Sequence, residues 1–251
     1  MRVIKALALL PAAALPLLAA GPAYAEAGDS HTFTADLGTL NDSGTTGTAT
    51  VTSSGDQITV QLDVSGAVAG LPHAQHVHIG GAGVCPTMAD DQNGDGILST
   101  VEGQPSYGAI QVSLTTEGDT SPSSGLAVER MPTADDSGSY TYSRTIDVSS
   151  EVMANIEDGA ASIVVHGIDS INPSGKYDGE PKSELDPALP LEATAPAACG
   201  ELTAAPAGGV DTGAGSTEGP EALGLFALGG VALAGAAGVG IYRRRLVGRD
   251  S

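Results

Sequence analysis

Four of the five histidines of the chain lie in two short segments whose composition is typical of β-strands. His73-Ala74-Gln75-His76-Val77-His78 holds three of them, and Ile163-Val164-Val165-His166-Gly167 holds the fourth. Because side chains alternate along a strand, His76 and His78 project from the same face. Two imidazoles on one strand and a third from another strand are typical of a copper or zinc site in an all-β scaffold. The alternative is a hydrogen-bonded cluster of histidines without a metal.

A second chemical motif runs from Asp91 to Glu102 and fits the twelve-residue calcium loop of EF-hand proteins. Gly96 stands where that loop turns sharply. Cys85-Pro86 before the loop, and Gly103 and Pro105 after it, argue against flanking helices. The sequence therefore predicts a lone structural calcium loop inserted in a β-domain, and the alternative is an ordinary Asp, Asn and Gly turn. The predicted ligands are the side chains of Asp91, Asn93, Asp95 and Glu102, the carbonyl of Ile97, and Ser99 acting through a water.

The N-terminus reads as a secretory signal peptide over residues 1–25. Two basic residues come first, an apolar stretch follows, and Ala23-Tyr24-Ala25 is a small-residue cleavage site. The alternative, an N-terminal membrane anchor, is disfavoured because Pro11 and Pro16 interrupt the apolar stretch. The remainder of the chain is therefore predicted to be exported.

The C-terminus reads as a surface anchor. A flexible stalk over 204–221 leads to an apolar segment, 222–242, and a basic tail, 243–251, which begins with three arginines and would remain cytoplasmic. About 20 apolar residues span a bilayer, so the sequence predicts a transmembrane or sorting-signal helix at the cell surface. The arrangement resembles Gram-positive sorting signals, although only Thr212-Gly213 matches their motif. The alternative is a weakly apolar tail without an anchor.

The two cysteines, Cys85 and Cys199, both fall in the exported part of the chain. An even number of cysteines in an exported domain usually means a disulfide, and two free thiols are the alternative. A disulfide would leave no cysteine free for catalysis, and the chain has no Gly-x-Ser-x-Gly motif. The sequence therefore does not support a cysteine or serine hydrolase.

The exported domain is strongly acidic. From Glu26 to Gly213 there are 27 Asp and Glu against 4 Lys and Arg, a net charge of −23. Such a surface repels nucleic acid and anionic lipid, and it favours divalent cations. Nucleic acid is therefore excluded as a partner.

Alternating apolar residues predict an all-β domain over residues 26–203. Many short strands with Gly-rich connections favour an antiparallel sandwich or barrel. One hairpin turn is expected at Ser53-Ser54-Gly55-Asp56, and the only expected helix is a short turn over 150–156. The predicted strands are 31–37, 47–52, 57–64, 75–79, 109–115, 140–146 and 162–168.

The order of these features resembles the copper/zinc superoxide dismutase fold family, an eight-stranded Greek-key sandwich, and the related CHRD-type bacterial exported domains. The features are the His-Val-His strand, a cysteine and long loop after it, the Val-Val-His strand, and Ala198-Cys199-Gly200 near the end of the domain. The resemblance spans Glu26 to about Thr203. It implies that His76, His78 and His166 bind copper, and that Cys85 pairs with Cys199.

The chain departs from that family at two places. No histidine lies between His78 and His166, where the bridging histidine and the zinc ligands belong, so a zinc subsite is not expected. Residues 195–198 lack the arginine that attracts superoxide. His73 is the candidate for a fourth copper ligand, although Pro72 favours a turn at this point.

Two functions follow from these patterns. The first is copper-dependent superoxide dismutation by a cell-surface domain without a zinc subsite. The alternative is a non-catalytic, calcium-stabilised surface module for binding or structural support. Retained histidines favour the first, and the net charge of −23 without a guiding arginine favours the second because it repels an anionic substrate.

Overall fold

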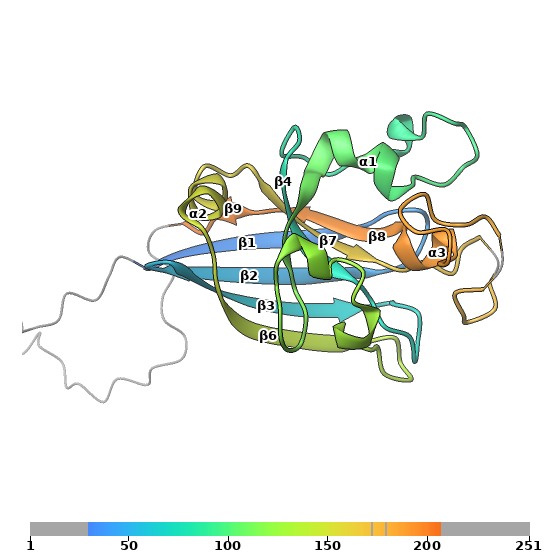
Figure 1. The fold of residues 1–251 in the computed structure, drawn as a ribbon, viewed down its shortest axis with the longest axis horizontal. Helices are drawn as coiled ribbons and strands as arrows, with labels where there is room; N and C mark the ends of the chain where they lie inside the picture. Colours follow the sequence, from blue (N-terminus) through green and yellow to red (C-terminus); the bar gives the residue numbers. More distant parts are fainter. Residues whose placement is uncertain (1–29, 172, 179, 207–251) are drawn as a thin grey trace, which may run out of the picture. The chain divides into compact units, whose positions relative to one another are not determined.

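The structure is a computed structural model that describes residues 30–171, 173–178 and 180–206 (Figure 1). The predicted signal peptide, nearly all of the predicted stalk, the apolar segment 222–242 and the basic tail lie outside these residues. Within the described ranges, no helix combines the length and hydropathy needed to cross a membrane.

The described chain is an all-β domain with a few short helices, and every strand pairing is antiparallel. All seven strands expected from alternation are present, as is the helix expected over 150–156. The strands are β1 (Ser30–Thr39), β2 (Thr46–Ser54), β3 (Gln57–Ser65), β4 (Gln75–Gly80), β5 (Gly108–Ser113), β6 (Tyr140–Asp147), β7 (Ala161–His166), β8 (Pro196–Glu201) and β9 (Thr203–Ala204). The helices are α1 (Thr100–Tyr107), α2 (Ser150–Glu157) and α3 (Leu191–Thr194), with single 3₁₀ turns at Met88–Asp90, Pro122–Ser124 and Val128–Arg130.

The strands form one continuous sheet in the order β5-β4-β7-β8-β1-β2-β3-β6, with β9 added beside β1. The expected eight-stranded sandwich or barrel is therefore a single curled sheet, a half-barrel. Its two halves join where Gly38 and Thr39 of β1 pair with Cys199 and Ala198 of β8. β1 therefore pairs with β2 in one half of the sheet and with β8 in the other.

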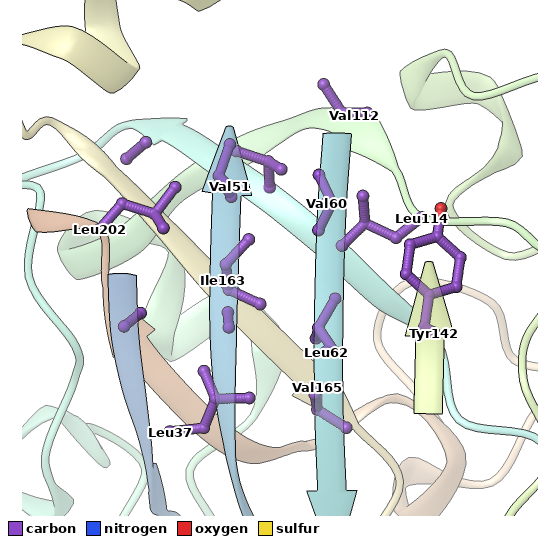
Figure 2. Close-up of a cluster of buried hydrophobic side chains, with 14 of the residues drawn as sticks. Leu37, Val51, Val60, Leu62, Val112, Leu114, Tyr142, Ile163, Val165 and Leu202 are labelled. Atoms are coloured by element: carbon purple, nitrogen blue, oxygen red, sulfur yellow. The ribbon is translucent and has the colours of Figure 1, made fainter. Parts of the chain in front are cut away.

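The hydrophobic core lies between the two halves of the sheet (Figure 2). Val60 and Leu62 of β3 enter it from one half, and Ile163 and Val165 of β7 enter it from the other. In β3 buried and more exposed residues alternate, whereas every residue of β7 is buried. The second face of β7 is thus covered as well, and the histidines lie on that face.

Helix α1 corrects the expectation that no helix follows the acidic loop. Ser99 begins it, because its hydroxyl accepts a hydrogen bond from the Glu102 N–H while the Glu102 carboxylate accepts one from the Ser99 N–H. Gly103 is required because a Cβ atom there would lie 2.7 Å from the Tyr107 ring. Pro105, which argues against a helix at this position, lies inside α1, a helix of only eight residues. The expectation of a single helix was likewise incomplete, because α3 is also present.

The expected disulfide between Cys85 and Cys199 is formed, with the two Cα atoms 5.7 Å apart. It ties the segment after β4 to β8. Cys199 itself pairs in register with Val164 of β7. The disulfide therefore links the loop that leads toward α1 to β8, the neighbour of the strand that carries His166.

Candidate metal centre

His76 and His78 lie on the face of β4 that points away from the core. Val77 and Ile79 alternate with them and belong to the core cluster. β4 is paired on both sides, with β5 and with β7, so its backbone is held at both edges. The structure brings the two histidine rings to a centroid distance of 5.5 Å.

His166 joins them from the end of β7. The register places Val164 opposite His76, and His166 lies two residues further along the same face. Its backbone N–H donates a 2.8 Å hydrogen bond to the Ala74 carbonyl. The His166 ring centroid lies 5.1 Å from that of His76 and 5.8 Å from that of His78. The three histidines implied by the sequence are thus brought together.

Backbone carbonyls fix the tautomer of each ring. His76 Nε2 donates to the Gly125 carbonyl at 2.9 Å, and His78 Nδ1 donates to the Gly108 carbonyl at 3.0 Å. His166 Nδ1 donates to the Thr194 carbonyl at 2.7 Å. Because a carbonyl oxygen only accepts, each of these nitrogens must carry the proton. The other nitrogen of each neutral ring is left with a free lone pair.

These remaining nitrogens are His76 Nδ1, His78 Nε2 and His166 Nε2. All three are buried and have no hydrogen-bond partner. Each histidine offers a ring nitrogen within 4.8 Å of one from each of the other two. Since metal–imidazole bonds are about 2.0 Å long, three nitrogens around one ion lie no more than about 4 Å apart. The rings therefore have to move somewhat closer to hold one ion, and imidazoles whose other nitrogen donates to a carbonyl are the usual form of metal ligand.

Burial keeps the three rings neutral. The side chains are 2%, 1% and 3% exposed for His76, His78 and His166. Desolvation lowers the pKa of His166 to about 4. Desolvation, with a smaller contribution from the neighbouring His166, lowers the pKa of His78 to about 3, and similar causes hold the pKa of His76 well below 6.5. Neutral imidazoles are the form that binds transition metals.

Helix α1 and the end of helix α3, which carries Thr194, cover the cluster. The Tyr107 ring packs edge-on against His78 with centroids 4.6 Å apart, and its hydroxyl donates to the Thr100 carbonyl. The Thr100 hydroxyl donates to the Thr194 carbonyl, which also accepts from His166. No side-chain pattern in the sequence indicates Gly108, Gly125 and Thr194, because these residues contact the histidines through their backbone carbonyls. Tyr107 was missed because no helix was expected there.

His73 lies outside this group. Its Nδ1 lies 2.9 Å from the His166 carbonyl, and its Nε2 lies 3.1 Å from the Val68 carbonyl. The Tyr177 hydroxyl lies within 3.4 Å of both nitrogens. His73 is not part of the convergent group of three, and its ring contacts the backbone of His166 and Val68 instead.

The carboxylates of the acidic loop accept backbone hydrogen bonds. Asp91 accepts them from the N–H groups of Gly94 and Gly96, and Glu102 accepts them from Gln92 and Asn93. Within the residues that the structure describes, His76, His78 and His166 are the only set of three or more His, Cys, Asp or Glu side chains that converge. The calcium prediction for Asp91, Asn93, Asp95, Ile97, Ser99 and Glu102 therefore gains no support.

The comparisons with known proteins yield distant likenesses among solved structures alone. No protein-family model matches the sequence, and no curated protein matches it. Among solved structures, the chain is similar to a variant of superoxide dismutase 5 from Candida albicans, at 15% sequence identity and a TM-score of 0.37. The match covers 74% of this chain and 98% of that one. A likeness at this level carries no argument about the site, whose chemistry rests on its own residues.

We expect the metal-free domain to lose stability as the pH falls from 6.5 to 5. The unfolded chain binds protons at its histidines near pH 6.5, whereas the folded rings resist protonation until about pH 4 or lower. Protons therefore favour the unfolded state, and each ring that remains neutral at pH 5 lowers the free energy of unfolding by about 2 kcal/mol. Urea unfolding at several pH values measures this loss. The His166→Gln variant should reduce it and His31→Gln should not, and a stability that stays constant over this range would contradict the prediction.

Proposed function

We propose that the domain binds one copper ion with His76, His78 and His166 as ligands. The observation that carries the proposal is the convergence of three buried, unpartnered ring nitrogens. A buried polar atom without a partner costs about 1–3 kcal/mol, and a bound ion offsets this cost at all three atoms. Imidazole ligands suit both copper and zinc. Copper is proposed because the same three histidines match the copper ligands of the family that the sequence resembles.

The proposed activity is slow superoxide dismutation. Bound copper supplies one-electron oxidation and reduction. The chain keeps the three imidazoles neutral through burial, fixes their tautomers through three carbonyls, and keeps bulk water away through α1. Residue contacts argue for a low rate, because both arginines of the part of the chain that the structure describes are engaged in hydrogen bonds rather than free to guide an anion. Arg144 donates to the Thr115 and Gly118 carbonyls, and Arg130 donates to the Asp119 carbonyl and the Ser124 hydroxyl.

Reconstitution of the secreted chain with copper tests this proposal. We expect about one Cu(II) per chain with nitrogen-dominated coordination, measured by metal analysis and electron paramagnetic resonance. Dismutation should be slow and should accelerate as ionic strength rises, because salt screens the repulsion between superoxide and the acidic surface. A chain that takes up no copper after reconstitution would overturn the proposal.

The alternative function is a calcium-stabilised surface module without catalysis. The observation in its favour is the compact loop from Asp91 to Glu102, which follows the calcium-loop pattern and leads directly into α1. A ligand that binds only the folded state stabilises it by about 2.7 kcal/mol at a hundredfold excess over its Kd. Calcium should then raise the melting temperature relative to EGTA, and Glu102→Gln should remove the difference. Equal melting curves with calcium and with EGTA would exclude this role.

The proposed location is the cell surface. Residues 1–25 and 222–242 support export and anchoring through their composition, in the membrane or by sorting to the cell wall. Mass spectrometry of the mature protein would test both ends. Retention of the first 25 residues would argue against export by a signal peptide.

A further inference from the structure

The orientation of His76 depends on a carbonyl that a loop supplies. His76 Nε2 donates a 2.9 Å hydrogen bond to the Gly125 carbonyl. Gly125 follows the 3₁₀ turn Pro122–Ser124 in the segment between β5 and β6, and its N–H donates to the Pro122 carbonyl at 3.1 Å. The turn packs closely on β5, because a Cβ atom at position 125 would lie 2.7 Å from Ile110 Cδ1. The position of this turn therefore decides where the acceptor for His76 lies.

Asp119, Ser124 and Arg130 hold the turn through hydrogen bonds to one another, and we call these three residues the loop clamp. The Ser124 hydroxyl donates to the Asp119 carboxylate and accepts from Arg130 Nη2 at 3.0 Å. Arg130 Nη1 donates to the Asp119 carbonyl at 3.1 Å, so the planar guanidinium bridges both residues. Ser124 is buried and directly precedes Gly125. The loop clamp thus acts on the residue next to the carbonyl that His76 uses.

The charged members of the loop clamp are themselves fixed. The Arg130 carbonyl accepts from the N–H and the hydroxyl of Thr116, at 2.7 and 2.9 Å. The Asp119 carboxylate also accepts from the N–H and the hydroxyl of Ser121. Hydrogen bonds from Ser124 above all, and from Ser121, lower the pKa of Asp119 to about 2. A cationic donor and an anionic acceptor therefore meet at the Ser124 hydroxyl, and such charge-assisted bonds are roughly twice as strong as neutral ones.

We propose that Arg130 is a positioning residue of the metal centre. Through Ser124 it holds the Gly125 carbonyl against His76 Nε2, and it thereby keeps His76 Nδ1 unprotonated and directed toward the other two histidines. This role rests on the proposed function and adds to it a residue that acts from behind a ligand. A neutral imidazole carries one proton, so a displaced Gly125 carbonyl no longer decides which nitrogen of His76 is free for the ion.

The first test compares two neighbouring serines by NMR of the histidine side chains in the metal-free secreted chain. Ser124→Ala removes the hydroxyl that Arg130 holds. Ser123→Ala is the matched control, because Ser123 donates to the same carboxylate from an exposed position. We expect the His76 Nε2–H to exchange with solvent roughly tenfold faster in Ser124→Ala and in Arg130→Met, because the turn then opens against fewer contacts. Ser123→Ala should exchange as the wild type does.

The His78 ring provides the internal reference, because its Nδ1–H donates to Gly108 on β5, away from the loop clamp. Its exchange rate should stay the same in all three variants. An unchanged rate at His76 in a folded Ser124→Ala variant would overturn the inference. An equal acceleration at His76 and His78 would also overturn it, because that result indicates a general loosening of the domain.

Copper binding provides the second measurement. Ser124→Ala and Arg130→Met should weaken Cu(II) binding roughly tenfold in competition with a chelator and should alter the hyperfine splitting in electron paramagnetic resonance, whereas Ser123→Ala should change neither. Affinity and spectra like those of the wild type in both variants would overturn the role of Arg130 at the metal. A wild type that takes up no copper refutes the proposed function instead, and the exchange rates of the metal-free chain then decide whether Arg130 positions His76.

Discussion

The His78→Ala and His166→Ala variants should each take up no copper under conditions in which the wild type takes up about one ion per chain. Each substitution removes one of three convergent nitrogens. Two imidazoles on a buried face cannot complete the coordination that copper prefers, and the apolar surroundings provide no substitute ligand. Metal analysis after gel filtration, with electron paramagnetic resonance of the loaded protein, measures the result.

Two controls separate loss of a ligand from loss of the fold. His31→Ala removes an exposed histidine of β1 and should leave copper uptake unchanged. Melting curves of the metal-free variants show whether the domain still folds, since each alanine leaves a cavity beside Tyr107 or Thr100. A folded His166→Ala variant that still takes up one copper ion would contradict the assignment of the site.

Replacing both cysteines by serine should lower the free energy of unfolding by about 4–5 kcal/mol. The disulfide closes a loop with a sequence separation of 114, and in the chain-entropy model such a loop restricts the unfolded state by this amount. Total stabilities of single domains are about 5–15 kcal/mol, so the loss is a large part of the whole. Urea unfolding of the wild type and of Cys85→Ser/Cys199→Ser measures it.

Mass spectrometry of a non-reduced digest provides the control for this experiment, because it must show the two cysteine peptides linked in the wild type. Reduction of the wild type should produce the same loss of stability as the double substitution. Two alkylatable thiols in the wild-type protein would rule out the disulfide, and equal stabilities with and without it would contradict the estimate from loop length.

Most strands were predictable from the sequence because they alternate. Val60 and Leu62 of β3 enter the core while their neighbours are more exposed, and this pattern repeats along β1, β2 and β6. β8 was missed because Pro196 and the alanines after it lack the branched and aromatic residues that indicate a strand. Its strand conformation comes from pairing with β7. α1 was not expected because Gly103 and Pro105 argue against a helix, whereas the Ser99 cap that begins it is evident only in the structure.

The residue types of the site were predictable from the sequence, but the ring nitrogens that carry the protons were not. The spacing of His76 and His78 indicates a shared face, whereas the partners that fix the tautomers are the carbonyls of Gly108, Gly125 and Thr194. Any residue carries a carbonyl, so no side-chain pattern identifies these three. His73 illustrates the same limit, because its contacts with the carbonyls of Val68 and His166 arise only in the folded chain.

The cover that α1 forms over the histidines has a consequence for exchange kinetics. Tyr107 packs against His78 and the Thr100 hydroxyl donates to the Thr194 carbonyl, so a hydrated ion reaches the ring nitrogens only when these contacts separate. The residence time of a metal then depends on how often the helix opens, and not only on how strongly the imidazoles bind. We expect a domain built in this way, once loaded, to retain an ion in metal-poor surroundings long after equilibrium would favour release.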